Sequence, residues 1–312
     1  MRAARMATKN PAALLAMCAL LIALTLALTS CSDRNAFQVL ERVQMFSLGY
    51  GVLEDQINLF NLPDAGPSLS TSRAMRDGIF FISNGNAAKL LTLSSFGDIL
   101  SMVYNPERNP KPSILSEEAS GQGLQGRVAK AYPFNEPGII AVDSKRTVFV
   151  QDRVPDERRS YDTAAEASLD YMVLRFSRDG EYLDFLGQEG VGGTPFPFIS
   201  GMYITAQDDC VVISTTGLGW TVFWFDPKGS LKSTTTVRRD SLPQAPGEDS
   251  LIPSLDGLSA AVDGSGIIIK IDYYREKVDA ETRTHAGMEF ASSVVWNLDR
   301  ESGLYTDPVE VP

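Results

Sequence analysis

The amino-acid sequence predicts an all-β protein, a β-propeller of four-stranded antiparallel blades that follows a cleaved signal peptide. Three observations lead to this prediction. A strand–turn–strand pattern with a Gly-bearing turn recurs along the chain, helical periodicity is scarce, and one strand is apolar on both faces. The chain has 312 residues, of which 44% are hydrophobic, so it is long enough to bury a sizeable core.

The recurring hairpin is clearest in residues 174–187, LRFSRDGEYLDFLG, where two short apolar strands flank Asp179-Gly180. Asp-Gly is a preferred hairpin turn because it tolerates positive φ. Residues 223–233, FWFDPKGSLKS, repeat the plan around Gly229. Each hairpin belongs to a unit that reads strand, turn, strand, gap, strand, Gly-bearing turn, strand. Four such units can be traced, at residues 77–104, 138–187, 200–237 and 256–311.

The third unit indicates how the sheets are covered. Its third strand places apolar or aromatic side chains on both faces, with Trp220, Val222 and Trp224 on one and Thr221, Phe223 and Phe225 on the other. Such a strand must be covered on both sides. Radial stacking of the sheets achieves this and gives a β-propeller, whereas the alternative is a β-sandwich of two larger sheets. The ordered repetition favours the propeller.

The expected number of blades is six, with five as the alternative. At about 40 to 50 residues per blade, residues 31–312 have room for about six. Residues 105–126 are rich in Pro, Ser, Gly and charge and are interpreted as a loop. Residues 45–60 are candidates for strands of a further blade that closes the ring with strands from the C-terminus. The only helix candidates are residues 35–46 and a turn within 163–172.

The amino terminus resembles an export signal. A basic start with Arg2, Arg5 and Lys9 precedes an apolar core at residues 11–27, which is the pattern of a secretory signal. The alternatives are a transmembrane anchor, for which the 18 residues from Pro11 to Leu28 lie near the lower limit of length, and ordinary cleavage after a small residue. We therefore expect a signal peptide at residues 1–30, a tether at 31–36 and the propeller domain at 37–312.

Residues 28–31, LTSC, follow the apolar core directly and resemble the bacterial lipobox. The resemblance implies that Cys31 carries a thioether-linked diacylglycerol and, after cleavage, an N-acyl group. Two or more acyl chains anchor a protein stably, since each buried methylene adds about 0.8 kcal/mol. Ser32 is compatible with outer-membrane sorting. The expected location is a bacterial cell envelope, on the outer membrane or on the outer leaflet of the inner membrane.

Cysteine and charge content set further limits. Cys18 lies in the signal and Cys31 takes lipid, so Cys210 alone remains, and it is expected to be a buried thiol without a disulfide partner. Without the first thirty residues, 25 basic side chains stand against 39 acidic ones, a formal charge of −14. An acidic surface repels phosphate backbones, which argues against nucleic acid and against binding anionic lipid through charge.

A resemblance to NHL-repeat β-propellers appears in residues 185–214, FLGQEGVGGTPFPFISGMYITAQDDCVVIS, which combine a Gly-rich link, a Phe-Pro segment and paired strands. Residues 138–152 and 173–187 match the same pattern, and the resemblance is best over residues 138–237. It implies a propeller but no particular chemistry, because members of that family mostly bind proteins, RNA or small ligands, and some are hydrolases or lyases. With the lipobox, the chain resembles bacterial propeller lipoproteins of the envelope.

No catalytic or metal constellation is visible in the sequence. The single His, His285, lies in a charged insert and is interpreted as a solvated residue, so a Ser-His-Asp arrangement is not expected. The acidic turns at residues 177–181, 206–210 and 262–266 lack the calcium-loop pattern and are interpreted as turns. Residues 190–193, GVGG, lack the Lys of a phosphate loop and are interpreted as a flexible link between blades. No cofactor is expected.

Binding is expected in the inserts between strands, because loops on a rigid scaffold usually carry it. The candidate inserts are residues 105–137, 153–169, 238–255 and 275–288. In the second of these, Arg153, Arg158 and Arg159 stand beside Asp156 and Glu157. The cluster is interpreted as a solvated loop, or alternatively as a docking site for a carboxylate-bearing partner.

Three functional hypotheses follow. The favoured one is a lipid-anchored, non-catalytic propeller that binds or scaffolds a protein or another envelope component. The second is a calcium-dependent hydrolase of lactonase type with carboxylates in the central channel. The third is a carbohydrate-binding propeller, which requires that Trp220 or Trp296 is solvent-exposed on one rim.

Overall fold

The computed structural model describes residues 41–60, 69–115, 127–279 and 281–311. The chain divides into residues 1–44 and a compact unit of residues 45–312, which contains every described strand. The described residues contain no α-helix, only the single-turn 3-10 helices η1 (Asp156–Arg158) and η2 (Arg239–Ser241). Both helix predictions are therefore wrong where they can be compared: residues 41–46 have no regular structure, and residues 163–166 form the turn of a hairpin.

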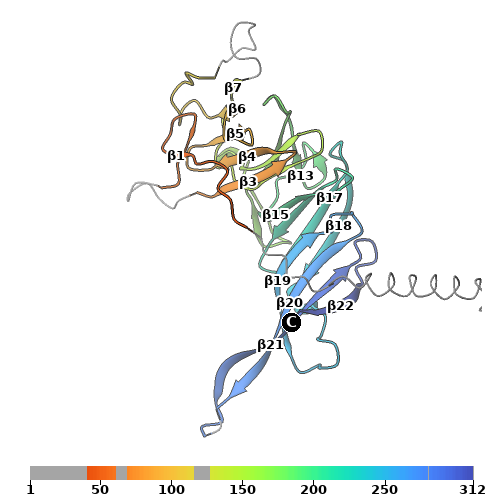
Figure 1. The fold of residues 1–312 in the computed structure, drawn as a ribbon. Coiled ribbons are helices and arrows are strands. Elements are labelled where there is room, and N and C mark those ends of the chain that lie inside the picture. The colour runs from red at the N-terminus through yellow and green to blue at the C-terminus, as the bar shows by residue number, and fades with distance from the viewer. Residues whose placement is uncertain (1–40, 61–68, 116–126, 280, 312) are drawn as a thin grey trace, which may run out of the picture. The chain divides into compact units, whose positions relative to one another are not determined.

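Four sheets, called the first to fourth blades, follow one another along the chain (Figure 1). In each blade four strands pair antiparallel in chain order. Only the second blade has a long insert, residues 154–170, between two of these strands. The first blade comprises β3 (Thr71–Arg76), β4 (Ile79–Asn84), β5 (Lys89–Leu93) and β6 (Ile99–Tyr104), with β7 (Val128–Ala131) added parallel to β6. The second comprises β8 (Ile140–Val142), β9 (Val148–Arg153), β12 (Tyr171–Phe176), β13 (Tyr182–Gly187) and the short β14 (Gly190–Val191).

The third blade comprises β15 (Phe198–Ile204), β16 (Cys210–Thr215), β17 (Gly219–Phe225) and β18 (Leu231–Arg238). The fourth comprises β19 (Ile252–Ala260), β20 (Ile267–Val278), β21 (His285–Leu298) and β22 (Tyr305–Val311). A separate hairpin of β10 (Ser160–Asp162) and β11 (Ala167–Leu169) lies in the insert of the second blade.

These sheets are β-propeller blades, as the sequence predicts. The traced units correspond to the four blades, with small differences in their bounds. The first blade begins six residues earlier because Asp77-Gly78 joins β3 to β4 in a two-residue turn, and the fourth begins four residues earlier, at Ile252. The number of blades differs from the prediction: the described residues form four, where six or five were expected. The GVGG link is also more ordered than expected, since Gly190 and Val191 pair with β13.

Consecutive blades pack face to face in chain order. The first and second share one hydrophobic cluster, the second and third another, and the third and fourth another. The period-2 alternation of β17 explains the arrangement: Val222 and Trp224 pack toward the fourth blade, whereas Phe223 and Phe225 pack toward the second. The expectation that this strand is covered on both faces is confirmed.

Residues 45–60 cover the free face of the first blade instead of completing a ring with C-terminal strands. They contain β1 (Gly49–Tyr50) and β2 (Gln56–Ile57), which pair parallel with each other. Ile57 packs with Leu115 against the first blade. β22 pairs only with β21, and within the described ranges no hydrophobic cluster joins the fourth blade to the first.

Two buried charged side chains hold this covering segment. The Lys89 ammonium donates a hydrogen bond to the Leu53 carbonyl at 2.6 Å, and burial lowers its pKa to about 8 against the opposing effect of Asp55 and Glu54. The Glu54 carboxylate accepts hydrogen bonds from the backbone N–H groups of residues 113–115. The segment is therefore tied to both the first blade and its following loop.

The Gly-bearing turn between the third and fourth strands has one design in all four blades. We call this turn the tip of the blade. A Ser or Asp at its first position accepts hydrogen bonds from backbone N–H groups two to four residues later, and a Gly near its end has φ between 70° and 88°. The first residues are Ser94, Ser177, Asp226 and Asp299, and the glycines are Gly97, Gly180, Gly229 and Gly303.

The tips of the second, third and fourth blades each pack on the preceding blade. Gly180 approaches Val103 of the first blade, and the adjacent Glu181 pairs with Lys130 at 2.7 Å. In the third blade, a Cβ atom on Gly229 would lie 2.7 Å from Leu186 of the second blade. The fourth blade contacts the third through the Arg300 carbonyl, which accepts a hydrogen bond from the Thr235 hydroxyl at 2.9 Å. The tips therefore fix the position of each blade relative to the preceding one.

Replacing Gly229 with Ala tests this packing, with Gly303→Ala as the matched control. Both glycines have positive φ, but a Cβ on Gly303 would meet nothing within 4 Å. We expect Gly303→Ala to lower the free energy of unfolding by about 1 kcal/mol through backbone strain. Gly229→Ala should cost roughly 1–3 kcal/mol more, because the methyl group overpacks the contact with the second blade. Urea denaturation measures both, and equal losses would contradict the contact.

Candidate functional site

The structure places the residues singled out from the sequence at separate points. Cys31, the predicted lipid-attachment residue, lies outside the described residues. Cys210 is a buried free thiol at the start of β16, as predicted, and burial raises its pKa far above the ordinary value. His285 is exposed near the end of the β20–β21 hairpin, with its Nε2 atom 3.5 Å from the Glu276 carboxylate. Its interpretation as a solvated residue is confirmed.

The arginine cluster of residues 153–159 is used within the chain. Arg153 pairs with Glu136 at 3.1 Å and with Asp170 at 3.6 Å. Arg159 pairs with Asp156 at 2.6 Å, and the Arg158 guanidinium lies 4.8 Å from the centre of the Phe185 ring. These contacts orient the insert on the second blade and leave the guanidinium groups less available for a partner's carboxylate.

A buried acid lies directly before this cluster. Asp152 is 1% exposed and accepts hydrogen bonds from the backbone N–H groups of Asn135, Glu136 and Arg153 at 2.7–3.2 Å. Burial nevertheless raises its pKa to about 7, since desolvation outweighs these donors, which act in the opposite direction. The carboxylate holds residues 134–137 at the start of the second blade, which is a structural role.

The two tryptophans of the carbohydrate hypothesis are not exposed on a rim. Trp296 is 9% exposed, and its Nε1 donates a hydrogen bond to the Tyr273 hydroxyl at 3.0 Å. Trp220 is half-buried, and the Arg239 guanidinium lies 4.2 Å from its ring. The exposure that this hypothesis requires is therefore absent at both positions.

The acidic turns have the turn geometry that was expected of them. Asp263 accepts hydrogen bonds from the backbone N–H and the hydroxyl of Ser265, and the Ser177 hydroxyl accepts from the N–H groups of Asp179 and Glu181. Asp209 is buried and accepts from Trp224 Nε1 at 2.8 Å and from Lys232 at 2.6 Å. In the part of the chain that the structure describes, no three His, Cys, Asp or Glu side chains are grouped so that they could hold a metal ion.

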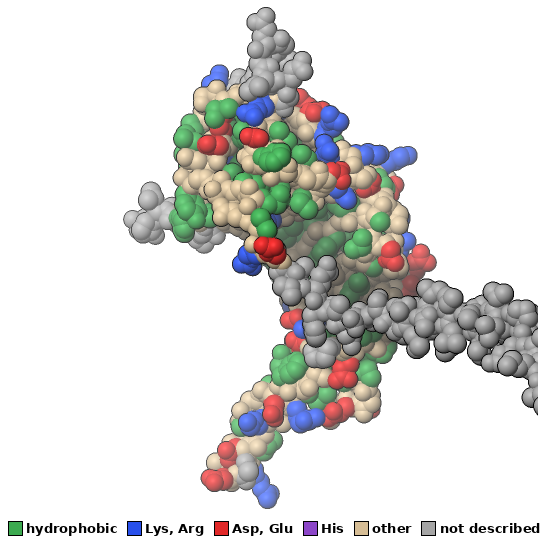
Figure 2. Space-filling view, viewed as in Figure 1, with side chains coloured by type: hydrophobic (Ala, Val, Ile, Leu, Met, Phe, Trp, Pro, Cys, Tyr) green, Lys and Arg blue, Asp and Glu red, His purple; other side chains and the backbone are tan. Residues whose placement is uncertain are grey.

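The fourth insert is not a loop, contrary to expectation. Most of residues 275–288 extend β20 and β21 into a hairpin that projects beyond the flanking strands β19 and β22 (Figure 1). Charged side chains of both signs cover its end (Figure 2). An ion pair between Arg275 and Glu248, at 2.8 Å, links the base of the hairpin to the preceding insert.

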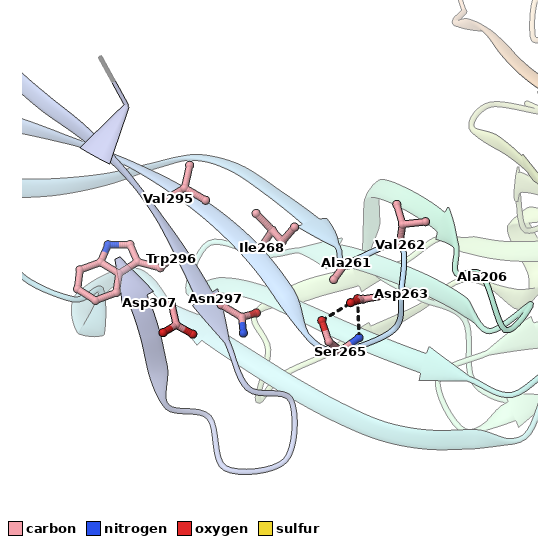
Figure 3. A pocket seen from close by; sticks show the side chains of 10 residues that line it. All are labelled: Ala206, Ala261, Val262, Asp263, Ser265, Ile268, Val295, Trp296, Asn297 and Asp307. Atoms are coloured by element: carbon pink, nitrogen blue, oxygen red, sulfur yellow. Dashed lines mark hydrogen bonds between the residues drawn. The ribbon is translucent and has the colours of Figure 1, made fainter. Parts of the chain in front are cut away.

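The strongest candidate site is an open pocket of about 630 Å³ on the fourth blade. Its ten lining residues come from the turn between β19 and β20, from β20, β21 and β22, and from the neighbouring turn of the third blade (Figure 3). They are Ala206, Ala261, Val262, Asp263, Ser265, Ile268, Val295, Trp296, Asn297 and Asp307. We call this the blade-4 pocket.

The blade-4 pocket lies on the face of the fourth blade that points away from the third. Ile268, Val295 and Asn297 lie on this face because they alternate with Ile267, Ile269 and Trp296, which pack against the third blade. Ile268 is 40% exposed and Val262 is 75% exposed. The pocket therefore offers apolar surface that no described residue of the chain covers.

The rim of the blade-4 pocket is acidic. Asp263 and Asp307 are its charged lining residues, and neither forms an ion pair within the described ranges. The hydrogen bonds from Ser265 hold the pKa of Asp263 below its ordinary value, so this carboxylate is ionised at neutral pH. Two carboxylates beside apolar side chains suit a cation that has an apolar body.

The middle of the same face is polar and internally paired. Lys270 donates hydrogen bonds to Asp256 at 2.7 Å and to Asp272 at 2.9 Å, and Ser293 donates to Asp272. Exposed apolar side chains also lie on this face away from the pocket: Ile252, Phe290, Val309 and Val311. Sequence analysis missed Ile268, Asn297 and Asp307 as site residues. A comparison of the last two units could have found them, because Lys270 and Asp272 mark a face that is not buried.

No protein-family profile matches the sequence, and no curated protein matches it. Among solved structures, an ulvan lyase, which is a polysaccharide lyase, is similar with a TM-score of 0.41 and 12% identity over 79% of this chain and 57% of its own. Hydrazine synthase from Kuenenia stuttgartiensis has a TM-score of 0.39 and 10% identity over 78% and 53%. A gluconolactonase from Xanthomonas campestris has a TM-score of 0.34 and 12% identity over 78% and 62%. The chain spans little more than half the length of the first two.

The fold and the site together define a β-propeller protein whose fourth blade carries an open, acid-rimmed pocket. In the described part of the chain, no helix has the length and apolar character needed to cross a bilayer.

Asp152 should make stability depend on pH. Its pKa rises from an ordinary value of 3.8 to about 7 on folding, so the folded protein binds the proton more tightly. Its contribution to stability is therefore complete below about pH 4 and is lost as pH rises through 7. Relative to Asp152→Asn, the wild-type protein should lose on the order of 1 kcal/mol per pH unit between pH 4 and 7.

Urea denaturation of both proteins at pH 4, 5, 6 and 7 measures this difference. Glu157→Gln, at an exposed acid of the same insert, is the control and should differ from wild type by a constant amount. A constant difference for Asp152→Asn as well would show that its pKa is not raised by folding.

Proposed function

We propose that this chain is a lipid-anchored protein of a bacterial envelope whose propeller binds a protein partner without catalysing a reaction. The observation that carries the binding function is the blade-4 pocket, in which unpaired carboxylates border exposed apolar side chains. The lipobox at residues 28–31 supports the anchoring.

The anchor and the charge of the domain fit one another. The part after residue 30 has a formal charge of −14, so an anionic membrane surface repels it. Attachment then depends on acyl chains at Cys31, because two or more chains supply enough buried methylene groups for stable anchoring. The propeller is held near the membrane without adhering to it through charge.

The pocket chemistry favours a basic side chain as the group that it recognises. Lys and Arg carry an apolar stem that can pack on Ile268 and Val295, and a charged end that can pair with Asp263 and Asp307. A protein partner presents such side chains on its surface. Opposite charges of this kind raise the rate of encounter and fix the orientation of the complex.

The two other hypotheses have less support. No observation on the described residues favours a calcium-dependent hydrolase. The carbohydrate-binding hypothesis depended on an exposed Trp220 or Trp296, and the first is half-buried while the second is buried.

Lipidation can be tested with Cys31→Ala. This variant should incorporate no radiolabelled palmitate and should leave the membrane fraction, because the thiol that accepts the lipid is absent. Cys210→Ala is the matched control: its thiol is buried in the third blade, so labelling and membrane location should stay unchanged. Palmitate incorporation by Cys31→Ala would exclude Cys31 as the attachment site.

Partner binding can be tested with a photocrosslinking amino acid, p-benzoylphenylalanine, at Ile268 in the blade-4 pocket. In envelopes of the producing cells it should capture a protein, whereas the same group at Tyr161, which is exposed on the second blade, should not. Adding Asp263→Asn and Asp307→Asn should lower the yield about tenfold, because these substitutions remove both charges that can pair with a basic side chain of the partner. Glu157→Gln is the charge control. An equal yield from Ile268 and Tyr161 would refute binding at the pocket.

A further inference from the structure

The blade-4 pocket occupies the place at which each earlier blade receives the tip of the next one. In each blade, the residue two positions before the first residue of its own tip marks the docking place for the tip of the next blade. It is Thr92 in the first blade, Arg175 in the second, Trp224 in the third and Asn297 in the fourth. The side chains of Arg175, Trp224 and Asn297 lie on the face that points away from the preceding blade, as the alternation of the strands requires. Thr92 lies on the face of the first blade opposite to Leu91 and Leu93, which pack with Ile57.

In the first three blades this position lies beside a tip. Thr92 lines a pocket of about 300 Å³ together with Arg178 and Asp179 from the tip of the second blade. Arg175 donates a hydrogen bond to the Lys228 carbonyl in the tip of the third blade at 3.1 Å. The Trp224 ring lies 4.9 Å from the Arg300 guanidinium in the tip of the fourth blade. Asn297 lines the blade-4 pocket, to which the described residues contribute no tip.

The docked tips share a chemical feature that the blade-4 pocket complements. Each carries one basic residue, one to three positions before its glycine: Arg178, Lys228 and Arg300. The blade-4 pocket has two carboxylates and no basic residue in its lining. A tip with a Lys or Arg therefore complements the charge of the blade-4 pocket. It would also dock on the same face of the blade as the chain's own tips do.

The face of the fourth blade limits how much of a partner can pack on it. In the third blade the equivalent face is buried along its length, with Val211, Ile213 and Val222 at 0–2% exposure. In the fourth blade the matching positions are Ile268, Lys270 and Val295, and the Lys270 ion pairs keep the middle of the face polar. A whole blade would bury these ion pairs at a desolvation cost, whereas a tip in the pocket leaves them in solvent.

We infer that the blade-4 pocket binds a Gly-bearing β-hairpin tip with a Lys or Arg, supplied by a partner protein, in the pose that the chain's own tips adopt on their neighbours. This inference rests on the proposed function and specifies the structure that the pocket recognises. The partner is a different protein and not a second copy, because the three basic tips of this chain are already docked on its own blades. The remaining tip, residues 94–98, has no basic residue.

A cyclised hairpin peptide tests the inference directly. The probe has the sequence of residues 223–233, FWFDPKGSLKS, closed by a terminal disulfide. It is titrated against the purified, lipidated protein in detergent and followed by isothermal calorimetry. Binding should weaken at least tenfold when the peptide carries Lys228→Glu, when it is left linear, and when the protein carries Asp263→Asn and Asp307→Asn. Equal affinity of the cyclised and linear peptides, or no binding, overturns the inference.

The segment that crosslinks to p-benzoylphenylalanine at Ile268 separates this inference from the proposed function. Mass spectrometry of the crosslink should identify a strand–turn–strand segment with Gly and a basic residue in a protein other than this chain. A crosslink to a helical segment or to a second copy overturns the hairpin inference. If the partner is captured through a helix, the proposed function stands. No capture from Ile268 above the Tyr161 control overturns both.

Discussion

The close approach of each Gly-bearing tip to the preceding blade is the constraint on which the rest of the structure depends. A four-stranded sheet with two apolar faces is insoluble unless both faces are covered, and neighbouring sheets can cover one another only if their spacing is fixed. The tips fix it, because a glycine without Cβ lets the backbone at residue 229 approach Leu186 of the second blade. The capping Ser or Asp at the start of each tip then holds the turn in shape.

The first and fourth blades lie at the two ends of the stack, and their outer faces differ. The first blade is covered by residues 45–60, which are tied down by Glu54 and Lys89. The fourth blade instead balances the charges of its outer face through Lys270, Asp256 and Asp272, as terminal repeats of stacked proteins do. The blade-4 pocket is a hollow in this surface where exposed apolar side chains lie beside two carboxylates, and exposed apolar surface bordered by polar groups marks a place of interaction.

The sequence predicted the strands and hairpins well, because their local signals are repeated along the chain. It predicted the number of blades poorly, because that number depends on contacts between distant parts of the chain. The alternation in β17 and the Asp-Gly turn at Asp179-Gly180 predicted strands, faces and hairpins that the structure confirms. The blade number was derived from chain length, which counts residues 105–126 and 238–255 toward blades although they had been interpreted as a loop and an insert. The candidate site was missed because Asn297 and Asp307, taken one at a time, are ordinary polar residues. They are recognised as site residues only because they line the same pocket as Ile268.

Stacking in chain order gives the domain a property that a closed ring lacks. Because the hydrophobic clusters of the described residues join each blade only to its neighbours in the chain, stability is expected to be the sum of each blade's own stability and of three separate interfaces, as in a one-dimensional chain of coupled units. The fourth blade has one such interface and the third has two. Unfolding is therefore expected to start at the fourth blade and to advance inward, and an occupied blade-4 pocket adds the interface that this blade lacks.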